Sequence, residues 1–68
     1  MARLFLFLDG DEQASFTASV VPRVGEAVWL KTLEYEGTVL VESVEYQFDR
    51  SKAETYGNDD VCLYCKRK

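Results

Sequence analysis

The segment Val21–Leu30, VPRVGEAVWL, reads as a turn that leads into a strand. Pro22 lacks the N–H group that strand pairing requires, so pairing ends there, and Val24 and Gly25 then turn the chain. The segment Gly37–Val44, GTVLVESV, begins a longer strand directly at a glycine. This succession of turn, strand, turn and strand predicts a small, closed, antiparallel β-barrel.

The longer strand carries a change of phase in its apolar residues. Every second side chain of a strand faces the same side, so a group at odd positions and a group at even positions cannot both face the core. We expect an inserted residue, a β-bulge, near Glu42 and Ser43 to bring both groups inside. The alternative is a straight strand that buries Leu40 with the even group and leaves Glu42 as an exception. The odd group is Val39 and Val41, and the even group is Val44, Tyr46 and Phe48.

The remaining strands complete a five-stranded domain that spans residues 1–68. Val, Thr, Tyr, Phe and Trp crowd the middle of the chain, which favours strands over helices. The polar connection 49–60 allows two readings: a helical turn at 51–54, which matches a capping box, or a plain loop that turns at Gly57 and Asn58. The expected strands are Arg3–Leu8, Ala14–Val21, Ala27–Thr32, Thr38–Asp49 and Val61–Lys66.

The apolar run at 4–8 is too short for a signal peptide, whose core needs about 7–15 residues, and for a membrane span, which needs about 20. We therefore expect a cytoplasmic protein without membrane contact. A chain of 68 residues buries only about 60% of the surface that it exposes when unfolded, so its stability is marginal without a partner.

The formal net charge of −4, from 12 acidic and 8 basic residues, argues against nucleic acid as the main partner. The chain nevertheless ends in the basic triplet Lys66, Arg67 and Lys68, which could contact an anion. Arg3 would lie near this triplet if the terminal strands pair. The plainer interpretation is a solvated tail that keeps a hydrophobic strand soluble.

Cys62 and Cys65 form a C-x-x-C pattern, but in a strand they face opposite sides about 10 Å apart, beyond the reach of a disulfide. Zinc needs about four ligands, and the chain offers two thiols and no histidine. A metal shared across a dimer is the residual alternative. The absence of histidine also excludes Ser-His and Cys-His pairs within the chain. We expect no catalytic residue, no cofactor and no metal site.

Alternation along the strands predicts aromatic side chains on the outer face. If the leucines of 4–8 face the core, the two phenylalanines between them face outward, and the strands at 27–32 and 61–66 each add one outward ring. An exposed apolar patch of this kind marks an interface. Alternatively, strand bending buries some of these rings under the protein's own loops. The predicted interface residues are Phe5, Phe7, Trp29 and Tyr64.

The pattern resembles SH3-like small barrels, and more narrowly a group of small uncharacterised bacterial, phage or mobile-element proteins. These carry a Pro-Arg-x-Gly-acidic-x-Val-x-Leu opening and then Val-x-x-Val-x-x-x-Phe on the long strand. The resemblance implies a five-stranded, strongly bent antiparallel barrel and brings no catalytic residues with it. The residues that match are Pro22, Arg23, Gly25, Glu26, Val28, Leu30, Val41, Val44 and Phe48.

We therefore expect a non-enzymatic interaction module that associates with itself, with a homodimer as the first expectation. An adaptor that docks a peptide or another protein on the same aromatic residues is the alternative. A third hypothesis is weak nucleic-acid binding through Arg3, Lys31 and the basic triplet, with bases stacked on Trp29 or Tyr64.

Overall fold

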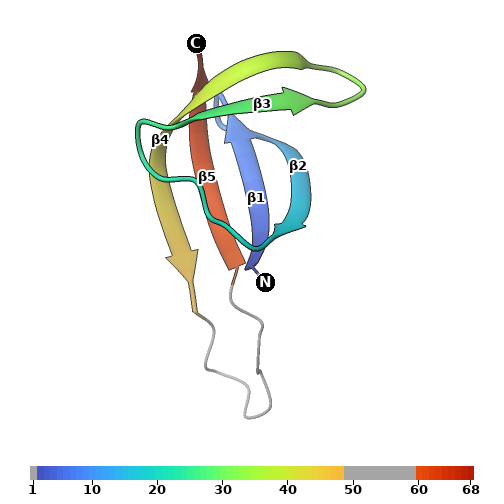
Figure 1. The fold of residues 1–68 in the computed structure, drawn as a ribbon. Helices are drawn as coiled ribbons and strands as arrows, with labels where there is room; N and C mark the ends of the chain where they lie inside the picture. The colour runs from blue at the N-terminus through green and yellow to red at the C-terminus, as the bar shows by residue number, and fades with distance from the viewer. Residues whose placement is uncertain (1, 49–59) are drawn as a thin grey trace.

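The computed structural model describes residues 2–48 and 60–68, which form one five-stranded sheet curled into a half-barrel (Figure 1). This confirms the predicted all-β architecture. The two readings of the connection between residues 49 and 59 lie outside the described residues. The strands are β1 (Ala2–Leu8), β2 (Asp11–Ala18), β3 (Ala27–Lys31), β4 (Glu36–Gln47) and β5 (Asp60–Arg67).

The sheet is mixed, so the prediction of a purely antiparallel barrel was wrong. Its strand order is β2-β1-β5-β4-β3, and β1 runs parallel to β5 while the other neighbours are antiparallel. Both strands of the parallel pair are apolar on both faces, a composition typical of strands in the interior of a sheet. The sheet also stops short of closure, because β2 and β3 remain as its two edges.

The predicted bulge in β4 is confirmed. The pairing of β4 with β5 shifts its register between Val41 and Ser43, which lets Val41 lie in the core and Val44 pack against it. Tyr46 and Phe48, which we expected inside, are instead 54% and 61% exposed. They lie at the far end of the strand, where their rings stack on each other with centroids 6.0 Å apart.

The strand β2 begins earlier than predicted because a tight turn fixes its register. Asp9 and Gly10 both adopt positive φ, 54° and 86°, so that Asp11 already pairs with Leu8. The strand therefore ends at Ala18 rather than continuing to residue 21. A second register shift, which the sequence pattern did not predict, falls between residues 6 and 7 of β1 in this pair.

The turn before β3 explains the proline, glycine and acidic residues of its sequence. Gly25 adopts a φ of 90°, in the region that favours glycine. The Arg23 N–H donates to the Glu26 carboxylate over 2.6 Å, and the Glu26 N–H donates to the Arg23 carbonyl over 3.0 Å. The acidic side chain thus caps the turn, which is a structural role for this part of the motif.

The core lies on the concave face of the sheet. Leu6 of β1 and Leu63 of β5 are neighbours in the parallel register, and both are fully buried. Figure 1 shows β3 passing across the ends of β1 and β5, and its Leu30 completes the core there. The buried cluster consists of Leu4, Leu6, Leu8, Leu30, Val39, Val41, Val61, Leu63 and Cys65.

Within residues 2–48 and 60–68, no helix is long and apolar enough to cross a membrane.

Candidate interaction surface

Three of the four predicted interface residues lie together on the outer face of the sheet. The register pairs Phe7 of β1 with Tyr64 of β5, and their rings stack with centroids 5.1 Å apart and an interplanar angle of 20°. Phe5 lies two residues before Phe7 on the same face, and the Arg3 guanidinium lies 4.9 Å from the centre of its ring. All three rings are half-buried. We call Phe5, Phe7 and Tyr64 the outer aromatic cluster.

The outer aromatic cluster has a polar border on its β4 side. The Tyr64 hydroxyl donates to Oε1 of Glu45 over 3.3 Å. The loss of solvent around the ring, and then the negative charge of Glu45, raise the pKa of the Tyr64 hydroxyl. This hydroxyl therefore stays protonated at neutral pH and acts as a hydrogen-bond donor.

The two cysteines face opposite sides of β5, as the period of a strand predicts. Cys65 belongs to the core cluster, whereas Cys62 is buried outside that cluster, beside Phe5 in the register. Both thiols are free. Burial raises the pKa of both, and the charges of Glu45 near Cys62 and Glu42 near Cys65 raise it further. Reactive cysteines have a lowered pKa, so these two environments suppress thiolate chemistry.

Trp29, the fourth predicted interface residue, lies apart from the outer aromatic cluster. It is the central residue of β3, is 62% exposed, and pairs with Thr38 of β4. In the register, Trp29 lies two strands away from Tyr64 across the sheet and four residues away along the strands. At about 4.8 Å per strand and 3.3 Å per residue, the two positions are roughly 16 Å apart. Ring contacts require centroids within about 7 Å. The predicted four-residue patch is therefore two separate surfaces.

The strand β3 is an edge strand, and only every second residue bonds to β4. The Val41 N–H donates to the Glu26 carbonyl over 3.0 Å, and the Thr32 N–H donates to the Tyr35 carbonyl over 2.7 Å. Because antiparallel pairs alternate between bonded and non-bonded, the even-numbered residues of β3 bond to β4. The odd-numbered residues direct their N–H and C=O groups to the free edge. These residues are Ala27, Trp29 and Lys31.

The basic C-terminal triplet is partly neutralised by acidic neighbours. Nζ of Lys66 lies 3.9 Å from the Glu42 carboxylate, and Nε of Arg67 lies 3.2 Å from the Asp9 carboxylate. The backbone N–H of Lys68 donates to the Thr38 carbonyl over 3.3 Å. A free phosphate would have to compete with these carboxylates for two of the three cations.

Arg3 does not lie near the triplet, which corrects the expectation from pairing of the terminal strands. The terminal strands do pair, but they run parallel, so Arg3 lies opposite Asp60 at the start of β5. The triplet lies at the other end of that strand.

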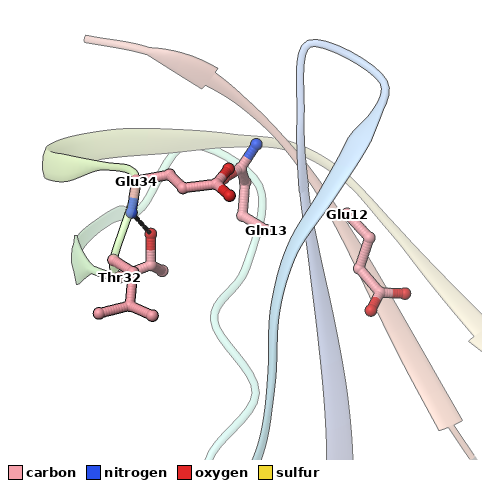
Figure 2. Close-up of a pocket in the computed structure, with 5 residues that line it drawn as sticks. Glu12, Gln13, Thr32 and Glu34 are labelled. Atoms are coloured by element: carbon pink, nitrogen blue, oxygen red, sulfur yellow. Dashed lines mark hydrogen bonds between the residues drawn. The ribbon is translucent and has the colours of Figure 1, made fainter.

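A shallow depression lies between the two edges of the half-barrel. Figure 2 shows Glu12 on one side of it and Thr32 and Glu34 on the other. Oγ1 of Thr32 accepts the N–H of Glu34 over 3.2 Å, which orders the turn between β3 and β4. No cluster of three metal-binding side chains occurs in the part of the chain that the structure describes. The remaining lining residues are Gln13 and Leu33.

Sequence reasoning missed the large apolar side chains that flank β3. Val24, before the strand, is exposed, and Leu33, in the turn after it, is fully exposed. Both lie in turns, where the alternation of a strand does not predict which way a side chain faces. Their exposure is therefore seen only in the structure.

No protein family, no curated protein and no solved structure matches this chain.

Proposed function

We propose that this chain is a small, non-enzymatic interaction module that associates with itself through the surface around Trp29. The oligomer that we propose is a homodimer. The observation that carries the proposal is the position of this residue. Trp29 is 62% exposed at the centre of an edge strand whose backbone groups are free on that side. Within residues 2–48 and 60–68 its ring stacks on no other ring.

The size of the tryptophan makes it the strongest anchor on the surface. A Trp side chain buries up to about 250 Å², so an exposed fraction of 62% leaves roughly 155 Å² to bury. Burial of that area contributes at most about 4 kcal/mol per copy at 25 cal/mol per Å². Two tryptophans therefore contribute at most about 8 kcal/mol, which lies within the association cost of about 4–15 kcal/mol. Neighbouring groups must add to them for a stable dimer.

The outer aromatic cluster is the second contact that we propose, and it contributes less than Trp29. Its rings are half-buried and already stacked within one copy. A partner that covered Phe5, Phe7 or Tyr64 would remove less apolar surface from water than one that covered Trp29.

A peptide-binding adaptor is the second candidate function, and the free edge of β3 favours it. An extended segment of another protein could add to this edge as a sixth strand and cover Trp29. Nucleic-acid binding has weaker support, because the chain is acidic overall and two cations of its basic triplet face carboxylates.

The relationship to SH3-like barrels and to small bacterial, phage or mobile-element proteins stays a prediction, as does the cytoplasmic location. A strongly bent β4 that serves both halves of the sheet supports the first of these, since the same device shapes small barrels.

The experiment that tests the proposal compares two exposed aromatic residues by sedimentation equilibrium. Trp29→Ala removes the proposed anchor, whereas Tyr46→Ala removes a ring of similar exposure at the opposite end of β4. We expect Trp29→Ala to weaken self-association at least tenfold and Tyr46→Ala to leave it unchanged, with both variants folded by circular dichroism. Unchanged association of Trp29→Ala would refute the proposal. If Trp29→Ala unfolds, the residue belongs to the core and the proposal fails as well.

A further inference from the structure

The free edge of β3 has a geometry that suits a second copy of the same strand. Three odd-numbered residues present free N–H and C=O groups there, and Trp29 is the middle one. Among the strands of residues 2–48 and 60–68, β3 contacts only β4. An antiparallel partner strand could therefore bond to this edge without displacing another strand.

We propose that two copies pair through their β3 strands, antiparallel, around a two-fold axis at Trp29. The inference rests on the proposed self-association and specifies its partner strand and register. Trp29 lies opposite its own copy, and Ala27 lies opposite Lys31 of the second copy. The two half-barrel sheets then form one continuous sheet across the dimer.

This register gives hydrogen-bond partners to more backbone groups than the adjacent registers do. A two-fold axis at Trp29 lets all three odd-numbered residues exchange bonds with the partner strand, about six hydrogen bonds in total. If the axis lies one residue away, at Val28 or Leu30, one odd-numbered residue of each copy has no β3 residue of the partner opposite it. The number of hydrogen bonds between the strands then falls to about four. An axis still further from Trp29 allows fewer hydrogen bonds again.

The side chains support the same axis. The exposed apolar residues Val24 and Leu33 lie five residues before and four residues after Trp29. Both residues lie in the turns that flank β3, so each end of the strand carries one exposed apolar side chain. The apolar surface around β3 is thus nearly symmetric about the proposed axis.

Charge also separates this register from others. Lys31 is the only charged residue of β3, and the proposed axis sets it against the neutral Ala27 of the second copy. An axis at Lys31 would set two ammonium groups opposite each other, which destabilises a strand pair.

The other edge strand, β2, suits self-pairing less well. It begins with two acidic residues, Asp11 and Glu12, and its ladder with β1 is interrupted by a register shift beside them. Irregular edges and like charges are features that discourage edge-to-edge pairing. We therefore assign the contact to β3.

The test uses two variants that each add one cysteine to the native pair, Ala27→Cys and Lys31→Cys, alone and mixed, oxidised with diamide. In the proposed register, residue 27 of one copy lies opposite residue 31 of the other, with Cα atoms about 5.5 Å apart. This distance suits a disulfide, whereas identical positions are offset by about 13 Å along the strand. The wild-type chain, whose two cysteines are buried, is the control.

We expect a covalent dimer only in the mixture. Random pairing of equal amounts makes about half of the dimers mixed, so at least about half should cross-link, and more if subunits exchange during oxidation. A covalent dimer from either variant alone would overturn the register. A dimer by sedimentation without cross-linking in the mixture would overturn the β3 pairing but leave the proposed self-association standing. A monomeric wild-type chain at all concentrations would overturn both.

A second measurement on the wild-type chain covers the case in which the cysteine variants fail to associate. Amide hydrogen exchange at residues 27, 29 and 31 should slow at least tenfold at a concentration where the dimer dominates, compared with dilute protein. Dimers in which these three amides exchange as fast as in the monomer would overturn the pairing.

Discussion

Replacement of Ala27 by proline tests the edge of β3 through its backbone rather than its side chains. Ala27 is the first residue of β3 and its N–H faces the free edge, a place where a strand tolerates proline. The matched control is Val28→Pro, one residue along, where the N–H faces β4 and the side chain packs against the core.

The expected magnitudes separate the two variants. Ala27→Pro removes one donor per copy, hence two bonds per symmetric dimer, at about 0.5–1.5 kcal/mol each. The dissociation constant should therefore rise about 5- to 140-fold, at 1.4 kcal/mol per tenfold change. Val28→Pro removes a bond to β4 and leaves its acceptor without a donor, which should cost about 1–3 kcal/mol of folding free energy, from a total of about 3–10 kcal/mol expected for this length.

Two assays on each variant decide the outcome. Urea unfolding followed by circular dichroism gives the folding free energy, and sedimentation equilibrium gives the dissociation constant. Ala27→Pro should keep the folding free energy of the wild-type chain and associate weakly, and Val28→Pro should lose at least about 1 kcal/mol of folding free energy. If Ala27→Pro unfolds as readily as Val28→Pro, the assignment of odd residues to the free edge is wrong. If it associates like the wild-type chain, the backbone edge does not form the contact.

Two further predictions concern the core and the thiols. Leu63→Ala removes a fully buried side chain at the centre of β5 and should lower the free energy of unfolding by about 2–5 kcal/mol. The change is measured from the urea midpoint. A loss below about 1 kcal/mol would contradict the central position of β5. Cys62 and Cys65, whose pKa values are raised by burial, should react slowly with iodoacetamide at pH 8 in the native protein and rapidly in urea. Because the unfolded thiols ionise first, the free energy of unfolding should fall as pH rises past their ordinary value of 9.0, and a rise there would contradict the burial of both groups.

The positions of most strands were predictable because they depend on local chemistry. The apolar residues of β4 change from odd to even positions, which predicted a bulge near Glu42, and the structure has its register shift there. The start of β2 was misplaced because the positive φ of Asp9, a residue other than glycine, gave no signal for so tight a turn. Local patterns therefore located the strands but set the limits of β2 three residues late.

The pairing of distant strands was not predictable by the same means. Alternation shows which face of a strand is apolar, but it does not show whether β5 runs parallel or antiparallel to β1. The apolar residues on both faces of these two strands were the available signal that they lie inside the sheet. The wrong direction also misplaced Arg3, which the parallel register sets opposite Asp60.

The candidate surface was predictable residue by residue but not as a whole. Alternation correctly directed Phe5, Phe7, Trp29 and Tyr64 to the outer face. It could not separate Trp29 from the other three, because that separation follows from the strand order β2-β1-β5-β4-β3. The free edge of β3 likewise exists only once the strand order is known.

The most direct test of the central claim, self-association, is the mass of the wild-type chain by light scattering coupled to size-exclusion chromatography. The measurement should cover a wide range of protein concentration at two salt levels. We predict a mass that rises with concentration from 7.8 kDa toward twice that value, with little dependence on salt because the contact is mainly apolar and backbone-mediated. A mass of 7.8 kDa at every concentration would contradict the account.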